Sequence, residues 1–295
     1  MNTPLVTIGI PFYNNQETLL SSIKSIFAQT YKNWELILVD DGSTDSSLHI
    51  ARFIDDSRVR VISDGINKKL AARLNQIIGL AKGKYVARMD ADDLCLPTRI
   101  ERQVQLLEKD SKVDIVGCGA VYLNKENEPL GQTMAPEIHE KICAYPYRTF
   151  GICHPSIVAR KSWYKKYYYD ETVTLGQDFN LWLRSYQSSV FANIPDPLYC
   201  YRLEASFMLV KQIKNRYTSA GYIFKHYQKR SCLYEALYYA MMQYLRMAAE
   251  IGFCSIGLKG KLLARRYKPL NNAEIEKYNS KIHDIENTNL PIIAT

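Results

Sequence analysis

The first 123 residues switch repeatedly between two hydrophobic periods, and this pattern constrains the fold more than any other feature. Short apolar runs typical of buried strands lie at 5–11, 34–39, 59–62, 85–89 and 114–123. Segments with apolar residues at helical spacing lie between these runs, for example at 16–29 and 70–81. Strands that are apolar along their whole length and alternate with helices form parallel sheets covered on both faces. We therefore predict an α/β domain with a mostly parallel sheet.

The rest of the chain is less regular. Residues 124–205 contain six prolines and predict mixed strand and loop, with one helix near 177–186. Residues 206–268 are helical in pattern and rich in Tyr, Met and Leu, whereas 271–295 predict a polar tail. We therefore expect one domain over 1–205 and a C-terminal helical extension over 206–295.

The positive charge of the chain is concentrated in its C-terminal third. The formal net charge is +8, yet residues 206–270 contain twelve Lys or Arg against two Glu, a net charge of +10. Such an excess suggests an anionic partner: a membrane surface, a phosphate-bearing acceptor or, less favoured, nucleic acid. Tyr, Met and Leu at helical spacing usually form a core, but interleaved with this charge they could also form a face that binds anionic lipid.

Cysteine usage and hydropathy bear on the compartment. The seven Cys are scattered, odd in number and never in a C-x-x-C, which indicates free thiols in a reducing compartment. The N-terminus has no basic-then-apolar signal pattern, and no run of 18 apolar residues predicts a transmembrane span. We expect a cytoplasmic protein, peripheral on the cytoplasmic face of the membrane if the basic segment binds lipid.

Three carboxylates follow the apolar run at 84–89. They belong to Asp90, Asp92 and Asp93, with Ala91 between the first two. Such a cluster is costly unless a hard divalent cation neutralises it, and carboxylate oxygens are the ligands that Mg2+ or Mn2+ prefer. The carboxyl ends of parallel strands are also where open α/β sheets bind ligands. The alternative is a solvated acidic loop that caps the helix beginning near Pro97.

Two other predicted strands also end in polar residues. Tyr13 and Asn14 follow the first strand, where an aromatic ring can stack on a base and an amide can bond its polar edge. Asp40 and Asp41 follow the second strand, and a carboxylate suits a base N–H or a ribose hydroxyl. A simple turn and helix capping are the respective alternatives.

Cations precede and enter the helix at 70–81. Lys69 and Arg73 could face phosphates, or they could be ordinary surface charges. The chain contains neither G-x-G-x-x-G nor G-x-x-x-x-G-K-[ST], so the dinucleotide-binding and Walker interpretations lack their phosphate loops. Polar strand ends from separate strand–helix units nevertheless converge on one sheet edge, which is typical of a nucleotide site.

Four motifs, in this order and spacing, resemble the inverting family 2 glycosyltransferases. They lie at 8–14, 39–45, 70–75 and 81–93, and the likeness extends over roughly residues 4–205. The resemblance implies a Rossmann-like GT-A fold, with the nucleotide sugar held by 1–123 and the acceptor by 124–205. The Gln-x-x-Arg-Trp of processive synthases is absent, which favours transfer of a single sugar, as in bacterial surface-polysaccharide enzymes.

The resemblance also implies roles in donor binding. Pro11, Tyr13 and Asp41 match nucleoside-binding positions. Asp90 and Asp92 match the D-x-D pair, with Asp92 the direct ligand of Mn2+ or Mg2+ and Asp90 nearer the ribose and sugar. The metal would bridge the two phosphates of the donor. The expected donor-binding residues are Pro11, Tyr13, Asn14, Asp41, Lys69, Arg73, Asp90, Ala91 and Asp92.

A later motif matches the acceptor side of the family. Asp178 matches the catalytic base that takes a proton from the acceptor hydroxyl, although a helix N-cap is the alternative. Gln177 stands where the family usually has Glu, which affects acceptor geometry more than the chemistry. The expected acceptor-side residues are His154, Gln177, Trp182 and Arg202.

These patterns predict a metal-dependent inverting glycosyltransferase. It would transfer one sugar from a nucleoside-diphosphate sugar, by default a UDP-sugar, to a hydroxyl of a glycan or lipid-linked glycan. A sugar nucleotidyltransferase is the nearer rival, but it would normally carry a Gly-rich, basic loop after the first strand, and 11–17 has none. The alternative from another class is a non-catalytic module that binds glycan or nucleic acid. Asp90, Asp92 and Asp178 would have no role in such a module, so we expect no nucleic acid partner.

Overall fold

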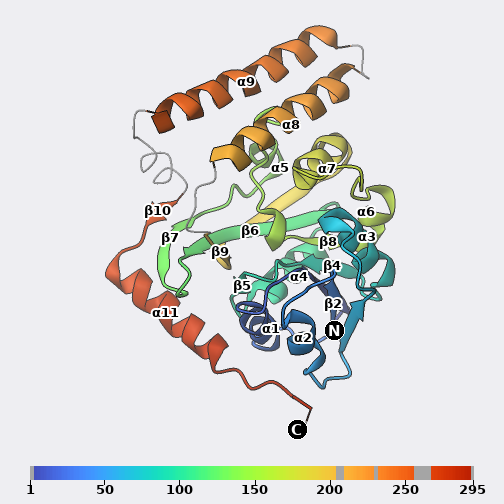
Figure 1. Ribbon diagram of the computed structural model, residues 1–295, viewed down its shortest axis with the longest axis vertical. Coiled ribbons are helices and arrows are strands. Elements are labelled where there is room, and N and C mark those ends of the chain that lie inside the picture. The colour runs from blue at the N-terminus through green and yellow to red at the C-terminus, as the bar shows by residue number, and fades with distance from the viewer. Residues whose placement is uncertain (1–2, 204–208, 229–231, 256–266, 294–295) are drawn as a thin grey trace.

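The N-terminal part of the chain forms parallel strands layered with helices (Figure 1). The computed structural model describes residues 3–203, 209–228, 232–255 and 267–293. Four strands pair in parallel in the order β3-β2-β1-β4. The strands and the helices between them are β1 (Val6–Phe12), α1 (Leu19–Phe27), β2 (Trp34–Asp40), α2 (Ser47–Arg52), β3 (Val59–Ser63), α3 (Lys69–Leu80) and β4 (Tyr85–Arg88). The predicted strand–helix alternation is confirmed over this region.

Beyond β4 the sheet is mixed, which corrects the mostly parallel sheet that we expected. Strand β8 (Val158–Arg160) lies between β4 and β6 (Ile115–Leu123) and is antiparallel to both. Strand β6 is also antiparallel to β7 (Pro129–Thr133) and parallel to β9 (Phe191–Arg202). Since β8 arrives from much later in the chain, only the tertiary structure decides that it, and not β6, pairs with β4.

Short elements surround this second half of the sheet. The predicted helix near 177–186 is confirmed as α7. The elements are β5 (Leu94–Cys95), α4 (Arg99–Lys109), α5 (His139–Ile142), the 3-10 turns η1 (His154–Ser156) and η2 (Tyr186–Ser188), α6 (Lys161–Lys166) and α7 (Gln177–Ser185). All seven cysteines are free, as the sequence predicted.

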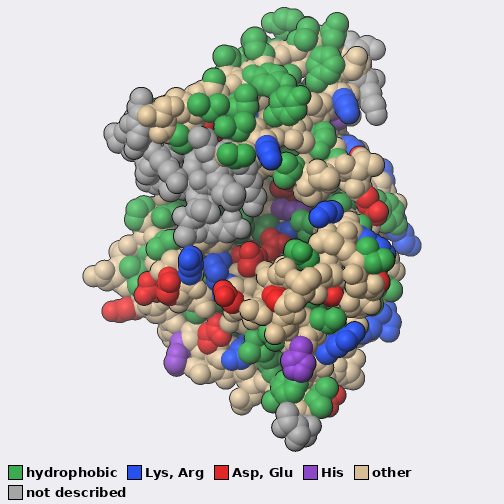
Figure 2. Space-filling model, viewed as in Figure 1, with side chains coloured by type: hydrophobic (Ala, Val, Ile, Leu, Met, Phe, Trp, Pro, Cys, Tyr) green, Lys and Arg blue, Asp and Glu red, His purple; other side chains and the backbone are tan. Residues whose placement is uncertain are grey.

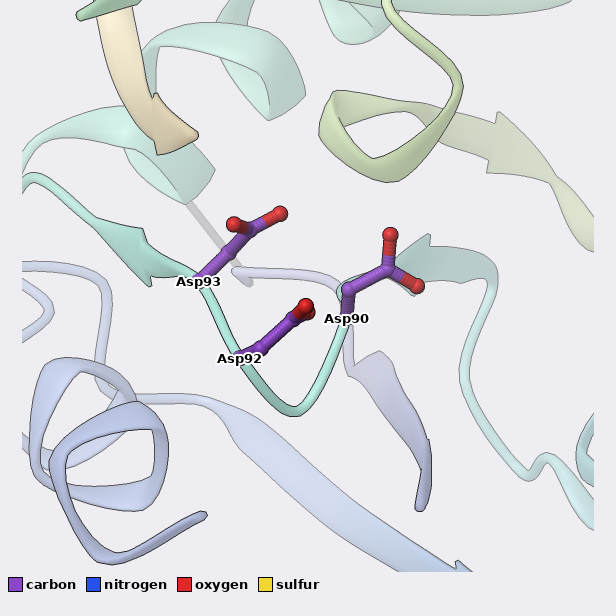
Figure 3. Close-up of side chains that lie close together, drawn as sticks. All are labelled: Asp90, Asp92 and Asp93. Carbon is purple, nitrogen blue, oxygen red and sulfur yellow. The ribbon is translucent and has the colours of Figure 1, made fainter. Parts of the chain in front are cut away.

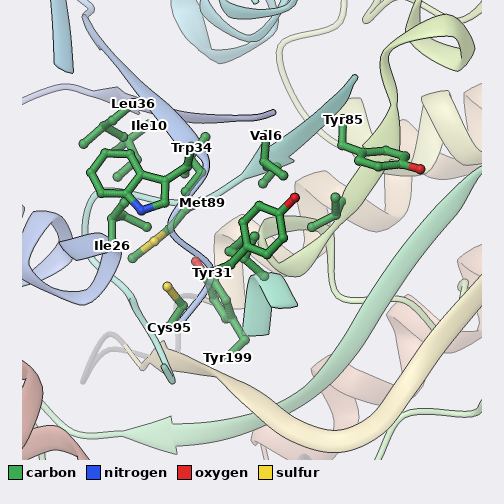
Figure 4. Packing of buried hydrophobic residues seen from close by; sticks show 14 of the residues in the cluster. Val6, Ile10, Ile26, Tyr31, Trp34, Leu36, Tyr85, Met89, Cys95 and Tyr199 are labelled. Carbon is green, nitrogen blue, oxygen red and sulfur yellow. The ribbon is translucent and has the colours of Figure 1, made fainter. Parts of the chain in front are cut away.

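The core joins the two halves of the sheet. Figure 4 shows side chains of β1, such as Val6 and Ile10, packed near Trp34, Met89 and Tyr199, and all of these are almost fully buried. The packing is tight, since a Cβ added at Gly9 would lie only 2.4 Å from a methyl carbon of Ile77 in α3. Burying this apolar surface is the main stabilising contribution, and it fixes the carboxyl ends of β1, β2 and β4 at one edge.

The C-terminal residues are of two kinds. Helices α8 (Leu209–Gln228) and α9 (Leu233–Ser255) lie side by side, away from the sheet, and confirm the predicted helical extension within the described residues (Figure 1). The polar tail predicted at 271–295 is wrong. Strand β10 (Lys268–Pro269) pairs with β7, and the next residues form helix α11 (Asn272–Glu286).

Helix α11 packs onto the sheet domain through three buried residues, Tyr278, Ile282 and Ile285. A reciprocal capping box between Asn271 and Glu274 begins the helix. The segment does carry apolar residues at helical spacing, namely Ile275, Tyr278, Ile282 and Ile285, and the prediction of a tail overlooked this signal because the residues between them are mostly polar or charged. The division at residue 205 stays a prediction, but β10 and α11 return to the sheet. No helix in the described ranges is long and apolar enough to cross a bilayer.

Candidate active site

Three carboxylates lie together in the turn after β4. Figure 3 shows the side chains of Asp90, Asp92 and Asp93 on one side of this turn, and their oxygens lie within 4.8 Å of one another. Burial, and next the Asp90 charge, raises the pKa of Asp92. Burial, followed by the charges of Asp92 and Asp90, raises the pKa of Asp93 well above its usual range. Crowded, partly desolvated carboxylates of this kind fit a hard divalent cation, which would neutralise their repulsion.

Asp93 differs from the other two carboxylates because the protein already holds both of its oxygens. The Tyr199 hydroxyl donates to Oδ2 at 2.8 Å, and the Arg202 backbone N–H donates to Oδ1 at 2.8 Å. Asp93 is therefore an anchor between the turn and β9. The sequence placed it in the acidic cluster, but its partners lie more than 100 residues away and could not be inferred.

Helix α1 fixes the backbone of the same turn. The hydroxyls of Thr18 and Ser22 donate to the Ala91 carbonyl at 3.0 and 2.8 Å, and Ser22 also donates to the Asp93 carbonyl at 2.7 Å. The Ala91 side chain is itself buried. Ala91 thus acts through its carbonyl as the point where α1 holds the acidic turn.

Arg88 lies at the end of β4 and was not singled out from the sequence. Its Nη2 donates to Asp90 Oδ1 at 2.6 Å, and the residue is only 4% exposed. Burial disfavours its charge, yet the nearby carboxylates, Asp90 foremost, raise its pKa. Its Nε and Nη1 have no hydrogen-bond partner among the described residues. The available signal was its position two residues before Asp90, on the same face of an extended segment.

The carboxyl ends of β1 and β2 meet beside this turn. Pro11 is buried in β1 in register with Val39, whereas the Tyr13 ring is 47% exposed at the sheet edge. Asn14 joins the two strand ends, since its side chain accepts the Thr44 backbone N–H at 2.8 Å. The structure therefore leaves Tyr13 accessible for stacking and gives Asn14 a local structural bond.

Asp41 and Arg73 form a buried ion pair instead of a free binding surface. Arg73 is fully buried, and its Nε donates to Asp41 Oδ1 at 2.9 Å. The remaining guanidinium N–H groups donate to Asp64, to the Gln76 side chain and to the Ile66 carbonyl. The phosphate contact considered for Arg73 is corrected on this evidence, because no donor of its fork is left for a ligand.

Lys69 opens α3 with a left-handed backbone, at φ +72°. Its backbone N–H and that of Lys68 donate to the Asp41 carboxylate at 3.1 and 2.7 Å. Asp41 therefore caps α3, whereas the alternative in the sequence was capping of the helix that directly follows 39–45, and the role of Asp41 in nucleoside binding stays a prediction. The Lys69 side chain is exposed.

Asp178 lies in the first turn of α7, after Gly176 in the left-handed conformation (φ +68°). Burial raises its pKa; the Phe179 N–H and the Arg88 charge oppose this, and Asp90 adds to it. Asp178 thus lies within the electrostatic reach of the acidic turn. Gln177 is partly exposed and donates to the Thr174 carbonyl at 3.0 Å, so it shapes the loop before α7.

His154 and Trp182 pack together beneath this region. His154 Nε2 lies 2.7 Å from the Tyr169 hydroxyl, and burial, helped by the Arg88 charge, lowers the His154 pKa well below its usual range. The Trp182 ring meets the His154 ring edge-on at 5.7 Å and is 2% exposed. Trp182 therefore lies in the core beneath the expected acceptor side, and its place among the acceptor-side residues stays a prediction.

Arg202 reaches back from the end of β9 to the acidic turn. Its guanidinium donates to the Asp92 carbonyl, and its Nε donates to Asn127 Oδ1 at 3.1 Å. The side chain therefore helps to fix the Asp92 backbone and is only partly exposed. Asn127, in a left-handed conformation at φ +65°, was not recognised from the sequence.

The comparisons with known proteins assign the chain to a family. The family model "Glycosyl transferase family 2" matches residues 7–168, which is more than half of the chain. The chain belongs to glycosyl transferase family 2 and is a glycosyltransferase. The expected family and enzyme class are thereby confirmed.

The chain is similar in sequence to other glycosyltransferases. A putative glycosyltransferase, EpsE of Bacillus subtilis, is 38% identical over 206 residues, covering 68% of this chain and 73% of that protein. WfgD of Escherichia coli, a UDP-Glc:α-D-GlcNAc-diphosphoundecaprenol β-1,3-glucosyltransferase, is 31% identical over 137 residues, covering 46% and 53%.

Solved structures confirm the GT-A fold. TarS 1–349 of S. aureus superimposes with a TM-score of 0.60 at 18% identity, covering 84% of this chain and 74% of that one. The mannosyltransferase PcManGT of Pyrobaculum calidifontis, solved with GDP-Man and Mn2+, gives 0.57 at 17% identity, covering 97% and 86%. At these identities the likeness concerns the fold alone.

Proposed function

We propose that this chain is a metal-dependent inverting glycosyltransferase that moves a single sugar from a nucleoside-diphosphate sugar to an acceptor hydroxyl. One observation carries the proposal: Asp90, Asp92 and Asp93 each place a carboxylate oxygen within 4.8 Å of the others in the turn after β4, where Arg88 donates to Asp90 at 2.6 Å. Asp178, whose pKa burial raises, is the candidate base. An acidic metal site and a separate candidate base are the two parts that such a transfer requires.

Asp90 and Asp92 would hold the cation, since both oxygens of Asp93 are already hydrogen-bonded within the protein. A bound Mn2+ or Mg2+ would neutralise charge on the departing nucleoside diphosphate. Arg88 orients Asp90 through its 2.6 Å bond, and its buried Nε and Nη1 have no hydrogen-bond partner in the part of the chain that the structure describes, which suits an anionic ligand here.

Asp178 would accept the proton of the acceptor hydroxyl as that oxygen attacks the anomeric carbon. Inversion follows because the attack comes from the face opposite the leaving diphosphate. The raised pKa makes Asp178 a stronger base than a solvated carboxylate. His154 is held neutral and bonded to Tyr169, so it would support the acceptor side without carrying charge.

The proposed donor and acceptor classes rest on the sheet edge and on the substrates named for similar proteins. Tyr13, Asp41 and the buried Pro11 form the edge on which the nucleoside would lie. TarS was solved with UDP-GlcNAc and WfgD acts on a diphosphoundecaprenol-linked sugar, and these names support a UDP-sugar and a lipid-linked glycan of polysaccharide synthesis. Such an acceptor, together with the free thiols, favours work at the cytoplasmic face of the membrane.

The test is binding and hydrolysis of UDP-, GDP-, dTDP- and CMP-sugars with Mn2+ or with EDTA. Binding of one nucleotide class that is lost with EDTA and in Asp92→Ala is the expected result. Asp196→Ala, which removes an exposed carboxylate elsewhere, is the matched control and should bind normally. Metal-independent binding, or none, would contradict the proposal.

A further inference from the structure

Helix α9 exposes an unusually apolar face for a helix on a protein surface. Eight large apolar or aromatic side chains of this helix are exposed, at 37% to 80% of their surface. They recur at helical spacing along one side: Leu233, Tyr234, Leu237, Tyr238, Met241, Tyr244, Leu245 and Ile251. Of the residues of α9, Glu235 alone is both charged and exposed. A continuous apolar face of this size marks an interaction surface.

The opposite side of α9 packs against the rest of the protein. Ala236, Ala240 and Gln243 are buried, and Gln243 donates to the Tyr147 carbonyl at 2.5 Å. The Tyr147 and Tyr239 rings stack at 4.2 Å. The exposed face is therefore not the missing half of an internal core, and its apolar character needs another partner.

The helix pair is also joined to the loop that carries the candidate base. Arg216 of α8 pairs with Glu250 of α9 at 2.8 Å. The Tyr222 hydroxyl of α8 donates to the Leu175 carbonyl at 3.1 Å, three residues before Asp178. Figure 2 shows that the apolar side chains over the two helices lie on the same face of the molecule as the hollow with the acidic groups. A surface bound by α9 would thus lie near the entrance to the active site.

We infer that the exposed face of α9 binds the surface of a bilayer that contains anionic phospholipid. Three properties support this inference, and the first of them selects lipid over a second copy of the chain. The segment 206–270 has a net charge of +10, although α9 itself holds only Arg246 against Glu235 and Glu250, so the sequence on either side of α9 is strongly basic; two copies would repel, while an anionic surface would attract. The face is rich in Tyr and Leu, which suit the headgroup boundary. No helix of the described residues can span a bilayer, so α9 would lie in the interface.

This inference deepens the proposed function, because a lipid-linked acceptor would be met within the same surface. It would orient the face that carries the hollow and its acidic groups toward the headgroups (Figure 2). Vesicle binding requires neither donor nor metal, so it can fail or succeed independently of the transfer chemistry.

The experiment is co-sedimentation of the full chain with phosphatidylglycerol-containing vesicles and with pure phosphatidylcholine vesicles. The test variant replaces Leu237, Met241 and Leu245 by Ser; the matched control is Met134→Ser with Ile138→Ser, which are similarly exposed but outside α8 and α9. We expect binding to anionic vesicles, weaker binding to phosphatidylcholine, and a loss of at least about tenfold in the triple variant. The control should bind like the unmodified chain.

Light scattering and circular dichroism on the same samples complete the test. Absence of binding to anionic vesicles, or equal binding by the triple variant, overturns the inference. A dimer of the unmodified chain that the triple variant loses, without vesicle binding, would assign the face to self-association and also overturn it. Metal-dependent UDP binding in parallel shows whether the proposed function stands on its own.

Discussion

The donor side of the sheet and helix α9 depart from ordinary protein surfaces in opposite directions. Around the sheet edge, charged side chains are buried: Arg73 is fully enclosed and Arg88 is 4% exposed. On α9, apolar side chains such as Tyr234 and Leu237 are exposed at 80% and 56%. Burying a charge or exposing an apolar face is unfavourable unless a partner compensates. The buried cations at the sheet have protein carboxylates as partners, Asp41 for Arg73 and Asp90 for Arg88, whereas the partner that we infer for the face of α9 is a lipid surface.

The largest effect should come from removing the candidate base. Asp178→Asn keeps the size of the side chain but cannot accept the acceptor proton, so sugar transfer should fall about 10³-fold. Initial rates with a lipid-linked acceptor measure this. Metal-dependent UDP binding should persist, and Asp196→Asn is the surface control. Nearly normal transfer would reduce Asp178 to a helix cap.

Breaking the buried charge pair should destabilise the fold. Arg73→Met leaves the Asp41 carboxylate without its buried cation, at an expected cost of about 3–5 kcal/mol in the free energy of unfolding. The same substitution at Arg102, whose pair with Asp196 is exposed, should cost no more than about 1 kcal/mol. Urea unfolding of both variants compares them. If both variants lose the same free energy of unfolding, the burial of Arg73 does not determine the contribution of its ion pair to stability.

A divalent cation should stabilise the same side of the molecule. Burial, and next the repulsion between neighbouring carboxylates, raises the pKa values of Asp92 and Asp93, and a bound cation would relieve that repulsion. At a hundredfold excess over Kd, Mn2+ should add about 2.7 kcal/mol to the free energy of unfolding and raise Tm. Calorimetry with Mn2+ and with EDTA measures the shift. It should disappear in Asp92→Ala, and a shift that survives there would place the metal elsewhere.

Activity should depend on pH through Asp178. The base must be deprotonated, so kcat/KM should rise with pH through a pKa that burial places above the usual carboxyl range. The Arg88 charge opposes this shift, so Arg88→Met should move the acidic limb to higher pH, and Arg88→Lys should restore part of it. A pH–rate profile of the three proteins decides. If the acidic limb of the kcat/KM profile lies at the same pH in Arg88→Met as in the unmodified chain, the Arg88 charge does not affect the pKa of Asp178.

The smallest effect on stability should come from the exposed face of α9. Replacing Leu237 and Met241 by Ser should change the free energy of unfolding in the absence of lipid by no more than about 0.5 kcal/mol, because both are already half exposed. Thermal unfolding measures it. A loss of several kcal/mol would show that the face contributes to the fold and would weaken the contrast with Arg73.

The sequence by itself determined the parts of the protein whose information is local. Strand and helix periods are local, so the β1–β4 units and α7 were predictable, and the acidic turn followed because a parallel strand delivers its carboxyl end to a known edge. The four motifs, three at strand ends and one in α3, sufficed for the family.

Only the tertiary structure decided what depends on distant partners. The insertion of β8 beside β4, the return of α11 to the sheet and the anchoring of Asp93 by Tyr199 join segments far apart in the chain. It also decided that Arg73 is a buried partner of Asp41, and that the apolar side of α9 faces outward. A local pattern shows that a side chain is charged or apolar, but what lies opposite it is fixed by the packing of the whole chain.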